Sequence, residues 1–305
     1  MLDGSPGQHT VLDDLGPGPL GPTFRARDTD TGRTVLVEDV AELVGGDPLV
    51  RSRFLTDARA AAAVSHPNVV RLFEVGEEGP RLSLVFEHVE GRRLDEASGP
   101  MDARRVVGLG IQLAEALGAA HAQGLVHLDV SPAHVTLNTR GHAKLAGVGL
   151  SAWRRRAASR GRAVDAGAER YRAPEQRRED AGDHRSDLFS LGLLLHALLT
   201  GQPPAAEASD VRPREVNGDV PAELDAIVHH ATAAAPAARY QSALALAAEL
   251  RSVGAVLDVR SGDREPPTMV TATARPAERS PGPLIPLAGI LIALAAGLWW
   301  WFGWS

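Results

Sequence analysis

The hydrophobic pattern of this chain changes character once, close to residue 91. Residues 10–91 hold short β-type runs, TVLVEDV and RLSLVFEHV, around one helical stretch, PLVRSRFLTDARAAAAVS. Residues 101–257 are mainly helical, as in DARRVVGLGIQLAEALGAAHAQG and SDLFSLGLLLHALLTG. We therefore expect an α+β fold with two lobes, a small β-rich lobe followed by a larger helical lobe.

A second feature is an uncharged segment near the C-terminal end. Residues 284–304 carry no charged side chain. As a helix they would be roughly 30 Å long, at about 1.5 Å per residue, which is the thickness of a bilayer core. The segment is therefore predicted to be a single transmembrane helix. Tryptophans, whose rings favour the lipid headgroup region, gather at its far end: Trp299, Trp300, Trp301 and Trp304.

The residues before this segment are predicted to form a flexible juxtamembrane linker. Residues 258–283 are rich in Pro, Thr, Ser and charged side chains, and they lack apolar periodicity. Arg275 and Arg279 lie just before the uncharged segment, and basic residues favour the cytoplasmic side of a membrane. We therefore expect residues 10–257 to form a cytoplasmic domain tethered to the cell membrane, with residues 1–9 as an N-terminal tail.

Composition narrows the chemistry that is open to the chain. Its formal net charge of −6 gives no reason to expect nucleic acid as a partner. It has no cysteine, which excludes disulfides and thiolate metal sites. Lys144 is its only lysine. A site that depends on a lysine at any other position must therefore be altered.

A glycine-rich stretch, LGPGPLGPTFRARD, places Gly16, Gly18 and Gly21 at the spacing G-x-G-x-x-G. In a dinucleotide-binding fingerprint this spacing would be followed by a helix. Here two strand-like runs follow, around the turn DTDTG, which indicates a hairpin instead. Six further segments follow in order: SHPNVVRLFEVG, GLVHLDVSPAHVTL, KLAGVGL, YRAPEQ, DHRSDLFSLGLLLHALLTGQPP and ARYQSALALAAELR.

In their order and spacing these segments resemble those of a protein kinase domain, over roughly residues 10–255. The similarity is greatest to membrane-anchored bacterial serine/threonine kinases of the eukaryotic-like type. It implies a kinase-like domain over residues 10–257, with a small lobe at residues 10–91 and a large lobe at residues 92–257. In active relatives the glycine-rich stretch covers the phosphates of ATP.

The resemblance also implies which residues would handle ATP, and several differ here. In TVLVEDV, Glu38 stands where the family has the lysine that holds the α- and β-phosphates. This reverses the charge, and a unit charge ~4 Å from a phosphate contributes about 4 kcal/mol at an effective dielectric near 20. Asp57 stands where the family has the helix glutamate that pairs with this lysine. Two carboxylates would then face each other, unless one protonates or the helix swings outward.

The segment GLVHLDVSPAHVTL keeps part of the family's catalytic loop. His127 and Asp129 match the motif H-x-D, with Asp129 at the position of the catalytic base. Leu128 replaces the arginine between them, and Ser131 replaces the lysine that steadies the transferred phosphate. His134 replaces the metal-binding asparagine, although Mg²⁺ prefers oxygen ligands. We expect Asp129 to be idle, because a general base needs a positioned substrate.

The magnesium loop and the glycine-rich stretch are changed as well. Gly147 replaces the metal-binding aspartate, and Val148 replaces the phenylalanine that follows it. We therefore expect Gly16, Gly18 and Gly21 to bind nucleotide weakly or not at all, with no metal site and with neither ATP nor Mg²⁺ as a cofactor. Three prolines, which offer no N–H to a phosphate, also interrupt the glycine-rich stretch: Pro17, Pro19 and Pro22.

The activation segment, residues 150–170, lacks the threonine whose phosphate an arginine grips in active relatives. It contains the basic stretch WRRRAASRGR instead. A solvated loop, a docking patch and a site where another kinase modifies Ser159 are the alternatives for this stretch.

Residues with structural roles in the family are kept. Glu175 and Arg239 match a buried ion pair, and Asp187 matches the residue that anchors the catalytic-loop backbone. His127 matches a stacking position in the core.

These substitutions indicate a pseudokinase, a membrane-tethered scaffold or regulatory binding module with little or no phosphotransfer. Its partner would be a protein, such as an active kinase or a phosphopeptide reader. One alternative is an atypical serine/threonine kinase in which Lys144 or Arg25 substitutes for the missing lysine. Another is a phosphorylation target, in which a partner kinase modifies linker threonines that a reader then binds: Thr268, Thr271 and Thr273.

Overall fold

The computed structural model describes residues 9–160, 167–178 and 182–262. Residues 1–261 make up one compact unit. The buried hydrophobic residues of its three core clusters all lie between Leu20 and Val253. A fragment that ends at Gly262 therefore contains the complete core of this unit.

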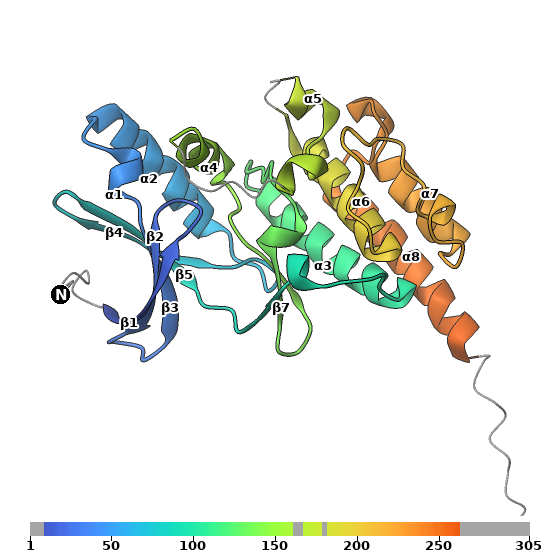
Figure 1. Ribbon diagram of the computed structural model, residues 1–305, viewed down its shortest axis with the longest axis horizontal. Coiled ribbons are helices and arrows are strands. Elements are labelled where there is room, and N and C mark those ends of the chain that lie inside the picture. Colours follow the sequence, from blue (N-terminus) through green and yellow to red (C-terminus); the bar gives the residue numbers. More distant parts are fainter. Residues whose placement is uncertain (1–8, 161–166, 179–181, 263–305) are drawn as a thin grey trace, which may run out of the picture. The chain divides into compact units, whose positions relative to one another are not determined.

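The small lobe is built on an antiparallel sheet with the strand order β1-β2-β3-β5-β4 (Figure 1). In the register of this sheet, Glu38 on β3 lies opposite Thr23 on β2 and Leu84 on β5. The predicted hairpin after the glycine-rich stretch is confirmed as the β2–β3 pair. The strands are β1 (His9–Pro17), β2 (Pro22–Asp28), β3 (Thr34–Asp39), β4 (Leu72–Glu78) and β5 (Arg81–Glu87).

One long helix covers the small-lobe sheet, as the sequence predicted. Helix α2 (Pro48–Ala63) begins with proline in its first turn, and the side chain of Asp47 caps it by accepting a hydrogen bond from Leu49 N at 2.8 Å. Phe54, Ala58 and Ala61 of α2 are buried in the small-lobe cluster. The short helix α1 (Ala41–Val44) precedes α2.

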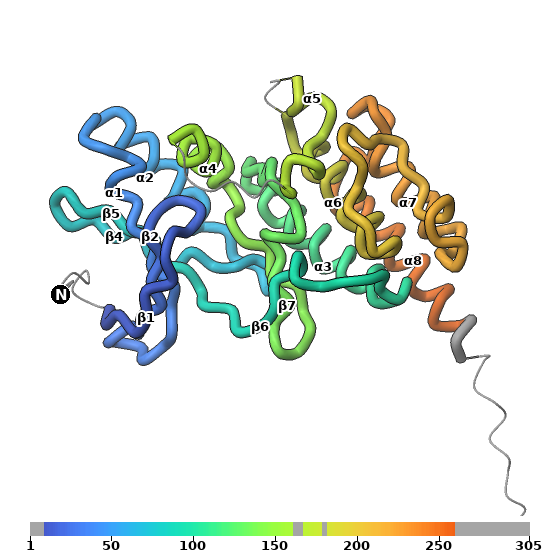
Figure 2. Tube along the Cα trace, viewed as in Figure 1, coloured from blue at the N-terminus to red at the C-terminus, as the bar shows by residue number. Residues whose placement is uncertain are grey.

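The large lobe is helical around α3 and α6, again as predicted. Helix α6 (His184–Thr200) is buried along most of its length, and Asp183 caps its first turn. A second, small sheet has the order β6-β7-β8, formed by β6 (Gly91–Arg93), β7 (Val135–Asn138) and β8 (Ala143–Leu145), and β6 and β7 lie side by side (Figure 2). The other helices are α3 (Ala103–His121), α5 (Pro174–Arg177), α7 (Ala222–Ala231) and α8 (Ala243–Gly262).

The basic stretch of the activation segment forms a helix, which the sequence analysis did not predict. Helix α4 (Ser151–Ala158) lies beside α2 of the small lobe (Figure 1). Trp153 and Ala157, one helical turn apart, are buried in the same cluster as Phe54 of α2. The apolar face of α4 therefore belongs to the small-lobe core, although the helix carries three consecutive arginines.

The boundaries at the two ends differ from the prediction. Strand β1 begins at His9, inside the predicted tail. Helix α8 continues to Gly262, so that residues 258–262 are helical and not part of a flexible linker. Arg104 of α3 ties this region down, since it donates to the carbonyl of Leu257 and pairs with Asp258 at 3.1 Å.

Within residues 9–160, 167–178 and 182–262, no helix is long and apolar enough to cross a bilayer. The predicted transmembrane helix at residues 284–304 lies outside the described residues. The same holds for residues 263–283 of the predicted linker, with Thr268, Thr271 and Thr273.

Candidate catalytic site

The backbone of the catalytic loop is held in place by one buried carboxylate. Asp187 of α6 accepts hydrogen bonds from His127 N at 2.9 Å, Leu128 N at 2.6 Å and His121 Nε2 at 2.8 Å. Leu128 has a φ of +57°, a strained conformation for a non-glycine residue, and the bond to Asp187 holds it there. The predicted anchoring role of Asp187 is thus confirmed.

The buried histidine of this loop also has the predicted structural role. His127 is fully buried, its Nε2 bonds to the carbonyl of Ala146 at 2.8 Å, and its Nδ1 accepts from Asp129 N at 3.2 Å. It therefore connects the catalytic loop to the magnesium loop that begins after β8.

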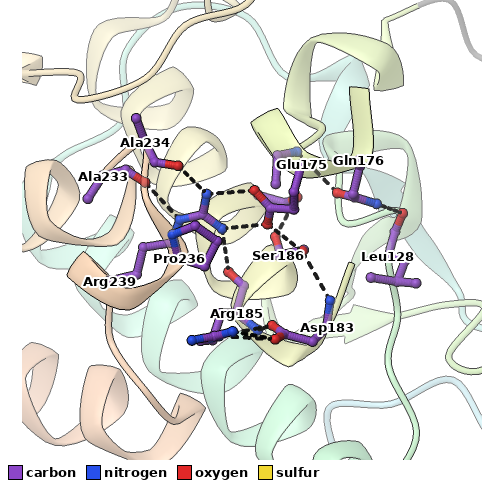
Figure 3. Close-up of polar contacts among 12 residues, drawn as sticks. Leu128, Glu175, Gln176, Asp183, Arg185, Ser186, Ala233, Ala234, Pro236 and Arg239 are labelled. Carbon is purple, nitrogen blue, oxygen red and sulfur yellow. Dashed lines mark hydrogen bonds and ion pairs between the residues drawn. The ribbon is translucent and has the colours of Figure 1, made fainter. Parts of the chain in front are cut away.

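A second predicted contact, the buried ion pair, is present with nearly ideal geometry. Arg239 donates in bidentate fashion to Glu175, at 2.7 and 2.8 Å, and further to the carbonyls of Ala233 and Ala234 (Figure 3). Ser186 Oγ donates to the same carboxylate at 2.6 Å. Although burial alone raises the pKa of Glu175, the hydrogen bonds from Arg239 and Ser186 hold it below its ordinary value. The large lobe is thus stabilised as in the family.

The side chain of Asp129 is engaged by an arginine from the activation segment. Nε of Arg154 on α4 donates to Oδ2 of Asp129 at 3.1 Å. The side chains are 10% and 19% exposed, so the pair is largely removed from water. Burial lowers the pKa of Arg154, but the charges of Asp129 and Glu38 oppose that effect, and the guanidinium remains charged.

The same guanidinium fills the space beside Gly147. This glycine has a φ of +82°, and a Cβ on it would coincide with Nη1 of Arg154. An aspartate, which the family has at this position, could not point into the site while Arg154 lies there. Nη2 of Arg154 is buried and has no hydrogen-bond partner within the part of the chain that the structure describes.

Ser131, His134 and Asp129 lie in a row, with a hydrogen bond between the first two. Ser131 Oγ lies 3.1 Å from His134 Nδ1, and His134 Nε2 lies 3.5 Å from Asp129 Oδ2. Burial, followed by the charge of Arg154, lowers the pKa of His134 well below its ordinary value, so the imidazole is neutral. The order Ser–His–Asp is that of a hydrolytic triad, but Ser131 is fully buried and cannot reach a substrate.

The glycine-rich stretch folds back on the small lobe. Gly18 donates to the carbonyl of Gly21 at 2.8 Å, and a Cβ on Gly18 would lie 2.7 Å from Oε1 of Glu38. Thr23 Oγ1 donates to Glu38 at 3.4 Å. Leu20, between the last two glycines, is 2% exposed and packs in the small-lobe cluster. The stretch therefore contacts the carboxylate that replaces the phosphate-binding lysine. Gly16 has a φ of +81° with open space around it.

The carboxylate of Asp57 has hydrogen-bond partners on α4 and α2. It accepts a hydrogen bond from Trp153 Nε1 at 3.0 Å, and Arg53 donates to it at 3.1 Å. The conflict between two carboxylates that the sequence predicted is thus relieved by partners on α4 and α2.

The two basic residues considered as substitutes for the missing lysine lie in other contacts. Lys144 Nζ pairs with Glu87 at the end of β5, at 2.7 Å. Arg25 Nε donates to Asp13 on the neighbouring strand at 2.7 Å. Neither contact involves Asp129 or Glu38.

Residues 153–160 of the basic stretch are not a solvated loop, and the docking patch stays a prediction. Arg154 points into the site, while Arg156 and Arg160 donate to the carbonyl of Leu43 at the end of α1, at 3.4 and 2.7 Å. Ser159 is exposed, and its Oγ donates to the carbonyl of Arg156 at 2.9 Å. The structure leaves modification of Ser159 as a prediction.

The residues at this site do not fit a complex of nucleotide and Mg²⁺. A guanidinium lies where a metal ligand would project from position 147, and the histidine at position 134 offers nitrogen instead of oxygen. Glu38 and Asp129 are acidic, which disfavours phosphate. The sequence analysis missed Arg154, Trp153 and Leu20. One signal was available in the sequence: the aspartate is missing at position 147, and a tryptophan followed by an arginine comes soon after it.

Comparison with known proteins agrees with this fold and with the motifs. The family model described as protein kinase domain matches residues 9–245. The serine/threonine-protein kinase PknB of Mycolicibacterium smegmatis is 33% identical over 260 residues, which cover 77% of this chain and 41% of PknB. PknL of Mycobacterium tuberculosis H37Rv is 32% identical over 261 residues, which cover 81% of this chain and 65% of PknL. The chain thus spans less than half the length of PknB.

A solved structure of a kinase domain has the same fold. The crystal structure of the Mycobacterium tuberculosis PknI kinase domain superimposes with a TM-score of 0.64 at 25% sequence identity. The match covers 80% of this chain and 96% of the PknI domain. The chain therefore belongs to the protein kinase family, as a member of the eukaryotic-like serine/threonine kinases of bacteria.

Proposed function

We propose that this kinase-fold protein is a pseudokinase, a signalling scaffold or regulatory binding module that does not transfer phosphate. One observation carries the proposal. The carboxylate of Asp129, at the position of the catalytic base, is bound by Arg154, whose guanidinium fills the space beside Gly147. A base in this contact has no room for a substrate hydroxyl next to a metal-bound phosphate.

The charges at the site support the same function. In active relatives a lysine at position 38 would attract phosphate, whereas Glu38 repels it and is covered by Gly18 and Thr23. The candidates for an atypical kinase, Lys144 and Arg25, pair with other carboxylates. The alternative of a phosphorylation target rests on Thr268, Thr271 and Thr273, outside the described residues, and no contact favours it.

Ligand binding and phosphotransfer test the proposal directly. Mg–ATP is expected to leave the Tm of the fragment 1–262 unchanged, as are ATP alone and MgCl₂ alone. A nucleotide that bound at a concentration 100 times its Kd would contribute about 2.7 kcal/mol, which corresponds to a Tm rise of roughly 5–10 °C. Transfer of radiolabelled phosphate by the wild type that is lost in Asp129→Asn would disprove the proposal.

We further propose that the module is tethered to the cell membrane by residues 284–304 and has a protein partner in the cytoplasm. The uncharged segment supports the tether. After fractionation of the host cells, the full chain is expected with the membranes and the fragment that ends at Gly262 in the soluble fraction. Recovery of both in the soluble fraction would remove the tether from the proposal.

A further inference from the structure

Helix α4 holds Arg154 in a fixed position. Trp153, its neighbour, is 6% exposed and packs edge-on against Phe54 of α2, with ring centroids 4.9 Å apart. The indole N–H also bonds to Asp57 of α2. Because the helix is anchored to α2 at this residue, the next side chain along the chain is directed toward the catalytic loop.

The charged groups around Arg154 come from three elements. Asp129 of the catalytic loop accepts its Nε hydrogen bond, and Glu38 of β3 attracts the guanidinium. Arg155, which is exposed on α4 itself, repels it. The guanidinium thus provides a positive charge that bonds to Asp129 of the large lobe and is attracted by Glu38 of the small lobe.

The two histidines beside Asp129 do not supply this charge. Burial lowers the pKa of His127 and of His134, and the nearby charge of Arg154 acts in the same direction. Both imidazoles are therefore neutral near pH 7, and the positive charge beside Asp129 comes from Arg154.

Arg154 and a metal ligand at position 147 exclude each other. Any side chain on Gly147 would meet the guanidinium at its first atom. The loss of the aspartate at position 147 and the presence of an inward-pointing arginine are therefore two parts of one arrangement, in which a side-chain cation lies where the family uses a bound ion.

We propose that Arg154 is a built-in cation that takes the place of the metal ion in this site, and that its charge holds α4 and the catalytic loop together. The inference extends the proposed function and rests on it, because a pseudokinase of this kind has no metal centre. A role in packing alone would need the bulk of the side chain and not its charge.

The experiment separates charge from bulk with three variants of the fragment 1–262. Arg154→Gln removes the charge, Arg154→Lys keeps it, and Arg155→Gln removes a neighbouring exposed charge as the matched control. Thermal unfolding is followed by the fluorescence of Trp153, the one tryptophan of this fragment. Nucleotide is left out, so that the result does not depend on the phosphotransfer assay.

Arg154→Gln is expected to lower the Tm at pH 7.5 by about 5–10 °C, since it leaves buried carboxylates without a counter-charge. Arg154→Lys should recover most of the Tm, and Arg155→Gln should change it by less than about 1–2 °C, because surface substitutions change stability little.

Three results would each overturn the proposal. One is a loss in Arg154→Lys as large as the loss in Arg154→Gln, because the charge would then not be what matters. Another is a loss no larger than that of Arg155→Gln. The third is a rise in the wild-type Tm when MgCl₂ is added without nucleotide, since a metal would then bind with the arginine in place.

Discussion

Trp153 donates its indole N–H to Asp57 across 3.0 Å, and this bond joins the activation segment to helix α2. Asp57 stands where active relatives have the glutamate that completes the phosphate-binding ion pair. In this protein the carboxylate of Asp57 binds Trp153 of α4 instead. This contact keeps the neighbouring Arg154 beside Asp129. The position of α2 is therefore coupled to the contact between Arg154 and Asp129.

This coupling predicts that Asp57 contributes to stability through Trp153. Replacement of Asp57 by Ala leaves a largely buried indole N–H without its acceptor, and should lower the free energy of unfolding by about 1–3 kcal/mol. Arg53→Ala is the control, because the Arg53 side chain is 76% exposed and such pairs contribute about 0–1 kcal/mol. Urea unfolding of both variants measures the difference. Equal effects would mean that the ion pair, and not the indole, accounts for the role of Asp57.

The ion pair of Glu175 and Arg239 should make the large lobe lose stability at acidic pH. Arg239 has no exposed side-chain surface, so Glu175→Gln should cost about 3–5 kcal/mol at pH 7. The pKa of Glu175 is lowered in the folded protein, so its contribution is complete above the unfolded value of about 4.3 and is lost as pH falls through the folded value.

Urea unfolding at a series of pH values measures this contribution. The difference between wild type and Glu175→Gln should narrow below about pH 4, where the unfolded carboxyl becomes protonated. A difference that stays constant down to the lowest pH at which the wild type folds would contradict the assignment of the proton to Glu175.

His134 should make the protein less stable on mild acidification. In the folded state its pKa lies well below the ordinary value. Below about pH 6.5 the histidine therefore binds a proton in the unfolded chain but stays neutral in the folded chain. The free energy of unfolding should therefore fall between about pH 7 and pH 5, and it should fall less steeply in His134→Asn. His142→Asn, an exposed position in the β7–β8 turn, is the control and should keep the wild-type slope. Identical slopes for all three proteins would rule out His134 as the titrating group.

Much of the fold follows from the sequence because its long elements are locally consistent. The apolar runs in α3 and α6 and the short runs of branched and aromatic side chains in β3 and β5 indicate these elements without help from distant residues. The structural contacts of Asp187, Glu175 and Arg239 could also be predicted, since short motifs carry them.

Helix α4 and the role of Arg154 could not be predicted in this way. The stretch SAWRRRAA carries three consecutive arginines, and it is stabilised as a helix by Trp153 packing on Phe54, far away in sequence. Arg154, Arg155 and Arg156 are consecutive and chemically equal, and only the docking of α4 decides which of them points into the site. The continuation of α8 to Gly262 likewise depends on contacts with Arg104 of α3.

The space beside Gly147 gives the sharpest test of where Arg154 lies, because the chain offers a matched glycine. Gly147 and Gly16 have nearly the same φ, +82° and +81°. A Cβ on Gly147 would meet Arg154, whereas a Cβ on Gly16 would meet nothing within 4 Å. Replacement of either glycine by alanine should cost about 1–2 kcal/mol for the left-handed conformation.

Gly147→Ala should cost more than Gly16→Ala, because the new methyl displaces the guanidinium from Asp129 and disrupts a largely buried pair. If the steric contact is the cause, the excess should vanish in an Arg154→Ala background, where Gly147→Ala would cost no more than Gly16→Ala. Urea unfolding of the single and double variants gives both numbers. If Gly147→Ala still cost more than Gly16→Ala in the Arg154→Ala background, the steric contact would involve another group. The guanidinium would then not be what fills the space beside position 147.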